Sequence, residues 1–443
     1  MKKIVFLVFV LGFLSTAVFV GFVSPVVATG TIYVRSDGSV DPATAPIQRI
    51  GNTYTFTENI YDEIVVERDN IAVDGAGYTL QGTRSGTGLD LSERTNVTIR
   101  NMEIREFLYG VYLYSSLSNS LSGNNMTNNS YGIRLRYSSN NNVSGNNIKN
   151  SFYGIWLSGS SNNTINENSI TANNNDGIWL SGSSDYNNVS GNNIKNNGFG
   201  IRLDDYSNNM FRNNDVSDNE YNFGVYGSSL PEFIQDIDDS NTVNGKPVYY
   251  WVNKRDIAVP LDAGWIALVN CTRITVKNLH LANNGQGVLL AYTKNSTITK
   301  NNITKNIHGI YLSGSSNNTI NENNITENSG NGIYLYYSPI NTFSNNNFIK
   351  NTNQVYNVGV SINVWDDGVE GNYWSDYEDR YPDATEMDCS GIWDTPYVID
   401  GNNQDSYPVV PEFPTWTSTL LLLVMFTVAI AIYKRRLLKT PIH

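Results

Sequence analysis

The chain is poor in the side chains that build soft-metal sites. Its 443 residues include 2 cysteines, 3 histidines and 6 methionines. Copper needs such donors grouped together, but Met102, Met126, Met210 and Met387 are scattered and the histidines do not cluster. The residues therefore give no support for copper, and no motif requires a cofactor.

Basic residues are also scarce. There are 29 Lys and Arg against 41 Asp and Glu, which gives a formal net charge of -12. An acidic chain without a basic stripe repels a phosphate backbone. We therefore expect no nucleic acid among its partners.

Long apolar runs are missing from the body of the chain, where each apolar segment spans about five residues at most. In their place, an asparagine-rich unit containing the phrase Gly-Ile-x-Leu recurs about every 22 residues. The glycines of its copies are Gly110, Gly132, Gly154, Gly177, Gly200, Gly287, Gly309 and Gly332. A period of this size indicates stacked coils rather than one globular core.

Each repeat holds three short apolar segments, for example Ile133 with Leu135, then Val143, then Ile148. Segments this short, separated by Gly, Ser and Asn, favour strands over helices. Ile-x-Leu places two apolar side chains on one face and x on the other. The pattern predicts an all-β fold, a single-stranded right-handed parallel β-helix with about 22–24 residues per coil.

One position of the repeat is held by asparagine, at Asn124, Asn146, Asn168, Asn192, Asn301 and Asn323. Stacked about 4.8 Å apart, these amides can hydrogen-bond along the rod and satisfy backbone groups at turns. Most of the asparagine is therefore predicted to be scaffold.

The ends of the chain predict its compartment. Lys2 and Lys3 precede a long apolar run that ends near Ala28, which indicates a secretory signal, with an uncleaved anchor as the alternative. A second apolar run, 416–433, is about 18 residues long and fits a membrane span. Basic residues follow it at once, so the positive-inside rule leaves the bulk of the chain extracellular.

The predicted organisation follows from these boundaries. It is a signal peptide 1–28, an N-terminal cap 29–64, a β-helix 65–365 with an irregular coil or loop near 228–282, an Asp- and aromatic-rich segment 366–410, a linker 411–415, a transmembrane helix 416–433 and a cytoplasmic tail 434–443.

Two extracellular modifications have candidate residues. Cys271 and Cys389 lie outside the repeat phrase and are candidates for a disulfide. Asn-x-Ser/Thr sequons supply candidate glycan sites at Asn96, Asn125, Asn142, Asn188, Asn270, Asn295, Asn302 and Asn324. A chain this rich in Asn, Ser and Thr also forms such sequons by composition alone.

The outward x of Gly-Ile-x-Leu forms a column of aromatic and arginine side chains. Aromatic rings pack against the C–H faces of sugars, while Arg and Asp bond hydroxyl or acidic groups. We therefore expect a strip that binds polysaccharide or cell-surface glycans, made of Tyr112, Arg134, Trp156, Trp179, Arg202, Asp204, Tyr311 and Tyr334. The alternative is that the same side chains only stack, which stabilises a sheet by about 0.2–1 kcal/mol per pair.

Catalysis has weaker candidates. Glycoside hydrolysis needs two carboxylates about 5–9.5 Å apart. Asp204 and Asp205 follow Arg202 on the strip, and Asp176 and Asp185 lie one coil before them. The alternative is that these carboxylates lie in solvated turns.

A hard-cation loop is a further candidate near the C-terminus. Glu386, Asp388, Ser390 and Asp394 place oxygen donors at loop positions 1, 3, 5 and 9 with glycine at position 6, as in a calcium loop. Position 12 has no glutamate, and an acidic surface loop is the alternative.

Together with the repeat, the segments 32–39, 73–82, 241–251 and 371–397 resemble the NosD-like right-handed β-helix proteins. The resemblance implies an archaeal type of surface protein with a C-terminal anchor, in which the Pro-Glu-Phe motif at 411–413 is a sorting signal for a sortase-like enzyme. The family name also implies copper delivery. The 386–394 loop departs from the family pattern at Glu386, Ser390 and Trp393, and no catalytic residue is carried over.

The expected function is therefore a secreted, membrane-anchored surface protein that binds glycan or another surface ligand. A polysaccharide lyase or glycoside hydrolase is the first alternative, and a metal accessory protein is the second.

Overall fold

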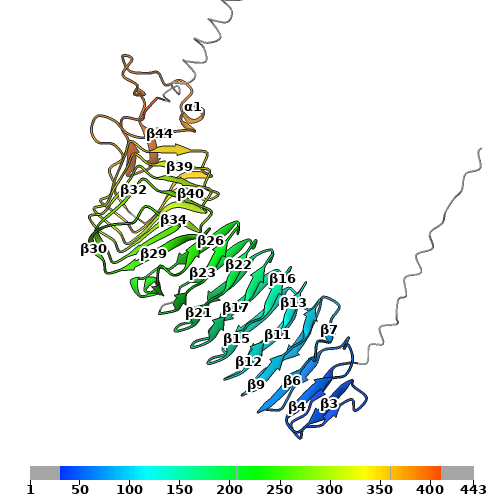
Figure 1. The fold of residues 1–443 in the computed structure, drawn as a ribbon. Coiled ribbons are helices and arrows are strands. Elements are labelled where there is room, and N and C mark those ends of the chain that lie inside the picture. Colours follow the sequence, from blue (N-terminus) through cyan, green and yellow to red (C-terminus); the bar gives the residue numbers. More distant parts are fainter. Residues whose placement is uncertain (1–29, 206–207, 360, 411–443) are drawn as a thin grey trace, which may run out of the picture.

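The computed structural model describes residues 30–205, 208–359 and 361–410, which form a rod of coiled strands (Figure 1). Helix is confined there to the 3-10 turn η1 (Leu230–Phe233) and the short α1 (Tyr377–Arg380). Neither of these is long and apolar enough to cross a membrane. The predicted signal peptide, linker, transmembrane helix and tail lie outside the described residues.

Sheet 1 carries the Gly-Ile-x-Leu strands of the first part of the rod. In spatial order it contains β2 (Val40–Asp41), β1 (Ile32–Val34), β5 (Ile64–Val66), β8 (Thr87–Asp90), β11 (Tyr109–Tyr114), β14 (Tyr131–Arg136), β17 (Tyr153–Ser158), β20 (Asp176–Ser181), β23 (Phe199–Asp204) and β26 (Tyr221–Tyr226). From β1 to β26 the pairs are parallel and in register, because each coil repeats the previous one.

Sheet 2 carries the second strand of each early coil. It contains β27 (Asp236–Ile237), β24 (Met210–Arg212), β21 (Asn188–Ser190), β18 (Thr164–Asn166), β15 (Asn142–Ser144), β12 (Ser120–Ser122), β9 (Val97–Arg100), β6 (Ile71–Asp74), β4 (Thr53–Phe56) and β3 (Ile47–Ile50). The antiparallel hairpin of β3 and β4 ends this sheet at the N-terminal side.

Sheet 3 has 14 strands and runs through the whole rod. It contains β7 (Thr79–Gln81), β10 (Glu103–Arg105), β13 (Asn125–Thr127), β16 (Asn147–Lys149), β19 (Ser169–Thr171), β22 (Asn193–Lys195), β25 (Asp215–Ser217), β28 (Thr242–Val243), β29 (Lys246–Val252), β31 (Trp265–Val269), β34 (Gln286–Ala291), β37 (His308–Ser313), β40 (Asn331–Tyr336) and β43 (Asn353–Val358).

Two smaller sheets complete the later coils. One contains β30 (Arg255–Ala258), β32 (Thr272–Lys277), β35 (Thr297–Thr299), β38 (Thr319–Asn321) and β41 (Thr342–Ser344), and the other contains β33 (His280–Ala282), β36 (Asn302–Thr304), β39 (Asn324–Thr326), β42 (Asn347–Ile349) and β44 (Tyr373–Trp374). A hairpin of β45 (Tyr397–Asp400) and β46 (Asn403–Asp405) lies in the C-terminal segment. The predicted all-β parallel β-helix is confirmed.

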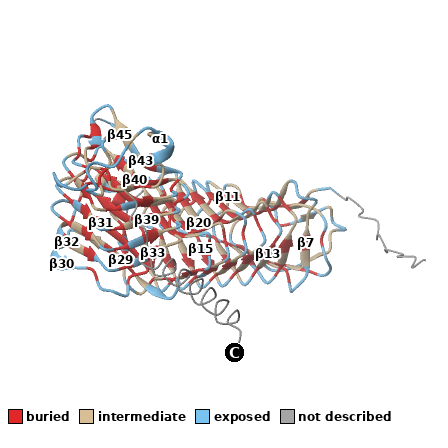
Figure 2. Ribbon diagram, turned by 90° about the horizontal axis from the view of Figure 1, so that it is seen from above, coloured by how far each residue is buried: buried red, intermediate tan, exposed pale blue. Residues whose placement is uncertain are grey.

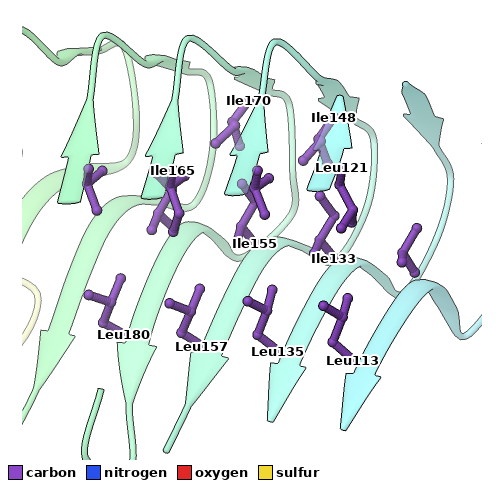
Figure 3. Packing of buried hydrophobic residues seen from close by; sticks show 14 of the residues in the cluster. Leu113, Leu121, Ile133, Leu135, Ile148, Ile155, Leu157, Ile165, Ile170 and Leu180 are labelled. Carbon is purple, nitrogen blue, oxygen red and sulfur yellow. The ribbon is translucent and has the colours of Figure 1, made fainter. Parts of the chain in front are cut away.

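The repeat apolar residues fill the interior of each coil. Ile133, Leu135 and Ile148 are fully buried, as are their counterparts in the following coils (Figure 3). Figure 2 shows the buried residues along the inside of the rod and the exposed ones at its turns. Fully burying one such side chain stabilises a fold by about 1.5–3 kcal/mol, so the stacked Ile and Leu rows are the main source of stability.

The predicted asparagine ladders are present. Asn168 Nδ2 donates to Asn192 Oδ1 in the next coil over 3.0 Å, and Asn146 Nδ2 donates to Asn168 Oδ1 over 3.1 Å. Both side chains are buried. Buried amides of this kind replace the hydrogen bonds that water would otherwise make to the turns.

The rod changes its sheet assignment at one hairpin. Asn244 and Gly245 both have positive φ, 49° and 74°, and they join antiparallel β28 and β29. An Asn-Gly pair with this geometry is typical of a tight hairpin. Beyond it, the Gly-Ile-x-Leu strands continue sheet 3 instead of sheet 1, so the rod has a first segment (30–243) and a second segment (246–410).

Sheet 1 therefore ends at β26, which abuts the start of β34. Asn222 N donates to Asn283 O over 2.7 Å, and Gly285 N donates to Phe223 O over 2.9 Å. In Figure 1 the strands of the second segment run at an angle to those of the first. The predicted irregular stretch 228–282 contains the Asn244-Gly245 hairpin, and the residues that form this junction flank the stretch.

Candidate functional site

The predicted outward column is present on sheet 1. Tyr112, Arg134 and Trp156 are register partners on successive strands, and so are Trp156, Trp179 and Arg202. We call these five residues the strip. Their order follows from the repeat, because one residue per coil occupies the same outward position.

The strip is a continuous stack rather than a row of open rings. The rings of Trp156 and Trp179 lie 4.3 Å apart and 10° from parallel, and the Arg134 guanidinium lies 3.0 Å from the centre of the Trp156 ring. Arg202 lies 5.2 Å from the Trp179 ring. The tryptophans are half-buried, and much of each ring face is covered by its neighbours.

The indole N–H groups are also engaged. Trp156 Nε1 donates to Ser181 Oγ and Trp179 Nε1 donates to Asp204 Oδ2, both over 2.8 Å. Arg202 pairs with Asp204 at 3.0 Å. Burial opposes the charge on Arg202, but the Asp204 carboxylate outweighs it and raises the arginine pKa. This end of the strip is therefore internally neutralised.

A neighbouring column, which sequence reasoning missed as a part of the site, supports the strip. The residues just before the repeat glycines stack as well: Tyr109 on Tyr131 and Tyr131 on Tyr153, each with 5.0 Å between ring centres. Tyr153 also contacts the rings of Trp156 and Trp179, at 5.5 and 5.7 Å. The Tyr-Gly and Phe-Gly pairs of the repeat were the available signal.

Asp176 interrupts this second column. It holds the position that tyrosine occupies in the preceding coils, is 1% exposed, and neither carboxylate oxygen has a hydrogen-bond partner. Burial raises the pKa of Asp176 to about 7, although Arg202 acts in the opposite direction. The side chain therefore carries a proton below neutral pH.

The other candidate acids are less confined. Asp205 is exposed, with a left-handed φ of 59°, and its pKa is raised by partial burial and by the charges of Glu232 and Asp204. Asp185 is half-buried, and its backbone N–H bonds Ser161 Oγ.

The later block of the predicted strip lies elsewhere. Leu289, Tyr311 and Tyr334 are in register with one another but belong to sheet 3. Leu289 and Tyr311 are buried within the core cluster of the first segment, and Tyr334 packs against that cluster. The expectation of one column shared by both blocks is therefore wrong, because the sheets change at the β28–β29 hairpin. On β26 the register partner of Arg202 is Gly224, so the aromatic column of sheet 1 ends at Arg202.

His308 lies beside this later column. Its ring is 5.0 Å from that of Tyr334, and Nδ1 lies 3.1 Å from Asn331 Nδ2. Burial lowers the pKa of His308 to about 4, so the imidazole is neutral at physiological pH.

The predicted disulfide is not formed in the structure. Cys271 is buried, and its Sγ contacts the carbonyl oxygens of Trp251 and Val269 at 3.2 and 3.4 Å. Cys389 is exposed in a loop of the C-terminal segment. The two thiols therefore lie in different environments, one in the core of a coil and one at the surface.

The predicted calcium loop does not gather its oxygens either. Glu386 Oε1 accepts from Gly391 N over 2.8 Å, and Asp394 accepts from Thr385 and Thr395. Asp388 and Ser390 are exposed. Across the described parts of the chain, no three His, Cys, Asp or Glu side chains are placed to share a metal ion. These carboxylates instead hold the turns of their own loop.

The sequon asparagines differ in exposure. Exposed side chains are found at Asn96, Asn142, Asn270, Asn295 and Asn302, and half-buried ones at Asn125, Asn188 and Asn324. Their glycosylation stays a prediction.

Comparison with known proteins places the chain in a family. The family model described as periplasmic copper-binding protein (NosD) matches residues 48–248 and 261–379. The chain belongs to the NosD family. The family description places NosD in the periplasm, which agrees with the prediction that the bulk of this chain lies outside the cytoplasm. No curated protein matches the chain.

Three solved structures show a likeness to this NosD-family chain at low identity and low TM-score. The A-module of mannuronan C-5 epimerase AlgE6 from Azotobacter vinelandii is 13% identical, with 70% of this chain and 87% of that chain covered and a TM-score of 0.33. The periplasmic alginate epimerase AlgG is 14% identical, with 71% and 80% covered and a TM-score of 0.32. The Dettilon tailspike protein is 14% identical, with 70% and 60% covered and a TM-score of 0.30.

The copper in the NosD description does not fit the residues present. Soft donors have to converge on the ion, whereas Met102 and Met126 are buried in the core and the Cys271 thiol faces backbone carbonyls. His280 and His308 contact asparagines of their own sheets. The described residues thus offer no copper site.

Proposed function

We propose that the outward face of sheet 1 binds polysaccharide outside the cell, with the apolar run 416–433 holding the protein at the membrane. The observation that carries the proposal is the ordered stack Arg134–Trp156–Trp179–Arg202. Within it, Trp156, Trp179 and Arg202 remain half-exposed along the rod. Such a row repeats at the spacing of the coils, about 4.8 Å, and presents ring edges and polar groups to an extended polymer.

The stacking constrains how a polymer is held. Because much of each tryptophan face is covered, sugar rings would lie across indole edges and bond the polar groups beside them, such as Ser181 and Asp204. The stack also keeps these side chains in one conformation before binding, which lowers the entropy cost of holding a ligand. Rigid aromatic anchors of this kind dominate many binding surfaces.

Replacing both Trp156 and Trp179 by alanine should abolish most of the binding. Truncating an aromatic anchor costs about 2 kcal/mol or more, so we expect retention on immobilised polymer to fall by at least about tenfold. The measurement is retention of the purified protein on a panel of neutral and acidic polysaccharides, with circular dichroism to check the fold.

The exposed Tyr78, which lies on another part of the rod, supplies the control through Tyr78→Ala. That variant should bind as the unmodified protein does. If the unmodified protein is retained by no polymer of the panel, or the double variant is retained equally well, the strip does not bind polysaccharide.

Glycosidic cleavage is a second candidate, favoured by Asp176. A carboxyl group that keeps its proton near neutral pH suits a general acid, and Asp204 and Arg202 are the charged groups that act on it. Asp176 is 1% exposed, so the rings around it would have to move for a substrate to reach it. Release of reducing ends or unsaturated sugars from the same panel separates an enzyme from a binding protein.

A further inference from the structure

The strip has unequal ends, and its N-terminal end carries positive charge without a counterion. Arg134 and Arg136 project from the same strand, β14. Neither forms an ion pair with a described carboxylate, whereas Arg202 at the other end pairs with Asp204. The groups that act on the Arg134 pKa are tyrosines and Arg136, and no carboxylate is among them.

Arg134 is held in an aromatic cage. Its guanidinium lies 3.0 Å from the Trp156 ring centre and 5.9 Å from that of Tyr131. The side chain is 9% exposed and Nη1 has no hydrogen-bond partner. Burial lowers the pKa of Arg134. A buried charge without an oppositely charged partner is costly. An anion brought close to this end of the strip would therefore be stabilised by the Arg134 charge.

Arg136 extends the positive charge to the surface. It is exposed, and hydrogen bonds to Tyr137 and Tyr112 raise its pKa. Its guanidinium lies 5.3 Å from the ring centre of Tyr137. Two guanidiniums on alternate outward positions of one strand can together receive a carboxylate or sulfate in a charge-assisted contact.

Tyr137 is an aromatic side chain at this end of the strip that is more exposed than the tryptophans. It is 54% exposed and has a left-handed φ of 52°. A Cβ added at Gly159 in the next coil would lie 2.6 Å from Tyr137 Cδ1, so the ring rests on that glycine. The backbone at Gly159 supports the ring, and about half of the Tyr137 side chain stays exposed for contact with a sugar.

We propose that this end of the strip selects an acidic polysaccharide. The acid group of one sugar unit lies over Arg134 and Arg136, its ring packs on Tyr137, and the following units run along Trp156 and Trp179. The assignment rests on the proposed polysaccharide binding and names its substrate class as a polymer that carries carboxylate or sulfate groups.

A single-stranded nucleic acid would also offer anions and stacking rings. The rest of the surface disfavours it. The protein has a net charge of -12. Asp176, Asp204 and Asp205 also lie near the Arg202 end of the strip. Binding of a phosphate backbone depends on many basic contacts, while one acid group at one end of the strip suits a sugar polymer.

The test compares polygalacturonate with its methyl ester, which has the same backbone without the charge, in the presence of a chelator. Dextran sulfate and dextran form a second pair, and oligothymidylate represents nucleic acid. The unmodified protein should bind at least one acidic polymer about tenfold more tightly than its neutral counterpart, the size expected of a charge-assisted contact. The pair that shows the preference identifies carboxylate or sulfate.

Arg136→Gln and Arg134→Gln should each remove most of that preference. Arg255→Gln is the matched control, because Arg255 is exposed on β30 in another sheet. Tyr137→Asn keeps a residue that tolerates left-handed φ but removes the ring, and it should weaken binding of the acidic and neutral polymers alike. Tyr337→Asn is its counterpart in the second segment, where Tyr337 rests on Gly359, and should have no effect.

The outcomes separate the two proposals. The selection of acidic sugars is overturned if acidic and neutral polymers bind equally well, or if Arg136→Gln keeps the full preference for the acidic polymer. The strip still stands as a polysaccharide site in that case, provided that the tryptophan double variant loses binding. Oligothymidylate binding as tight as that of the acidic polymer overturns the assignment to sugars.

Discussion

Asn168→Ala should destabilise the first segment by about 3–5 kcal/mol, because the substitution leaves several buried groups unpaired at about 1–3 kcal/mol each. Asn168 Oδ1 accepts from Asn146 N and Nδ2 at 3.0 and 3.1 Å. Its Nδ2 donates to Asn192 Oδ1 and Val143 O, both over 3.0 Å. The change is measured as the free energy of unfolding in urea.

A surface asparagine provides the comparison. Asn193 is exposed on β22, so Asn193→Ala should change the stability by less than about 0.5 kcal/mol. Asn168→Asp keeps the acceptor but turns an oxygen toward Asn192 Oδ1 and Val143 O, so it should be destabilising as well. A cost for Asn168→Ala no larger than for Asn193→Ala would show that water or a local shift replaces the ladder bonds.

The repeat predicted the coil, its core and its ladders because each is a local property copied along the chain. Ile133 and Leu135 alternate with outward residues, and that alternation alone decides which side is buried. The sequence did not distinguish two roles of asparagine. Asn146 stands in a buried ladder, whereas Asn150 has a left-handed φ of 54° at a turn.

The relation between the two segments was not predicted, because it depends on one turn rather than on the repeat. Asn244-Gly245 is a strong hairpin signal. The sequence does not show, however, which sheet the strands after the hairpin join. Tyr311 and Tyr334 match the phrase as well as Trp156 does, yet the sheet exchange places them against the end of the first segment. The exposure of these side chains depends on which residues pack against them in the fold, and the Gly-Ile-x-Leu repeat does not show which residues those are.

The candidate site was also predicted only in part, because the repeat determines the register of the strands but not the contacts of their side chains. The order Arg134, Trp156, Trp179, Arg202 follows from the register of identical coils. Two features depend on side-chain conformation: the rings cover one another, and Arg134 lacks a counterion. Arg202 has a counterion because Asp204 lies two residues further along the same strand. Such features become visible only when the side chains are placed.

Asp176→Asn should stabilise the protein, and the gain should grow with pH. The folded state holds the pKa of Asp176 at about 7, whereas an aspartate in an unfolded chain has a pKa of about 3.9. Between these values the folded protein keeps a proton that the unfolded chain has lost, so stability falls as pH rises from about 4 to about 7 and levels off above. At 1.36 kcal/mol per pKa unit, the gain at pH 8 is on the order of 2–4 kcal/mol.

A buried carboxyl that destabilises the fold suits a functional group, because activity can require a destabilised site. Unfolding by urea from pH 4 to pH 9 measures the stability, and the exposed Asp239 serves as control through Asp239→Asn, which should show no such gain. Asp176→Tyr restores the ring found in the preceding coils and should also stabilise. If Asp176→Asn gains nothing at pH 8, a bound cation or water relieves the charge. Asp176 is not part of the site if Asp176→Asn is more stable, binds polymer as well as the unmodified protein does and releases as much product.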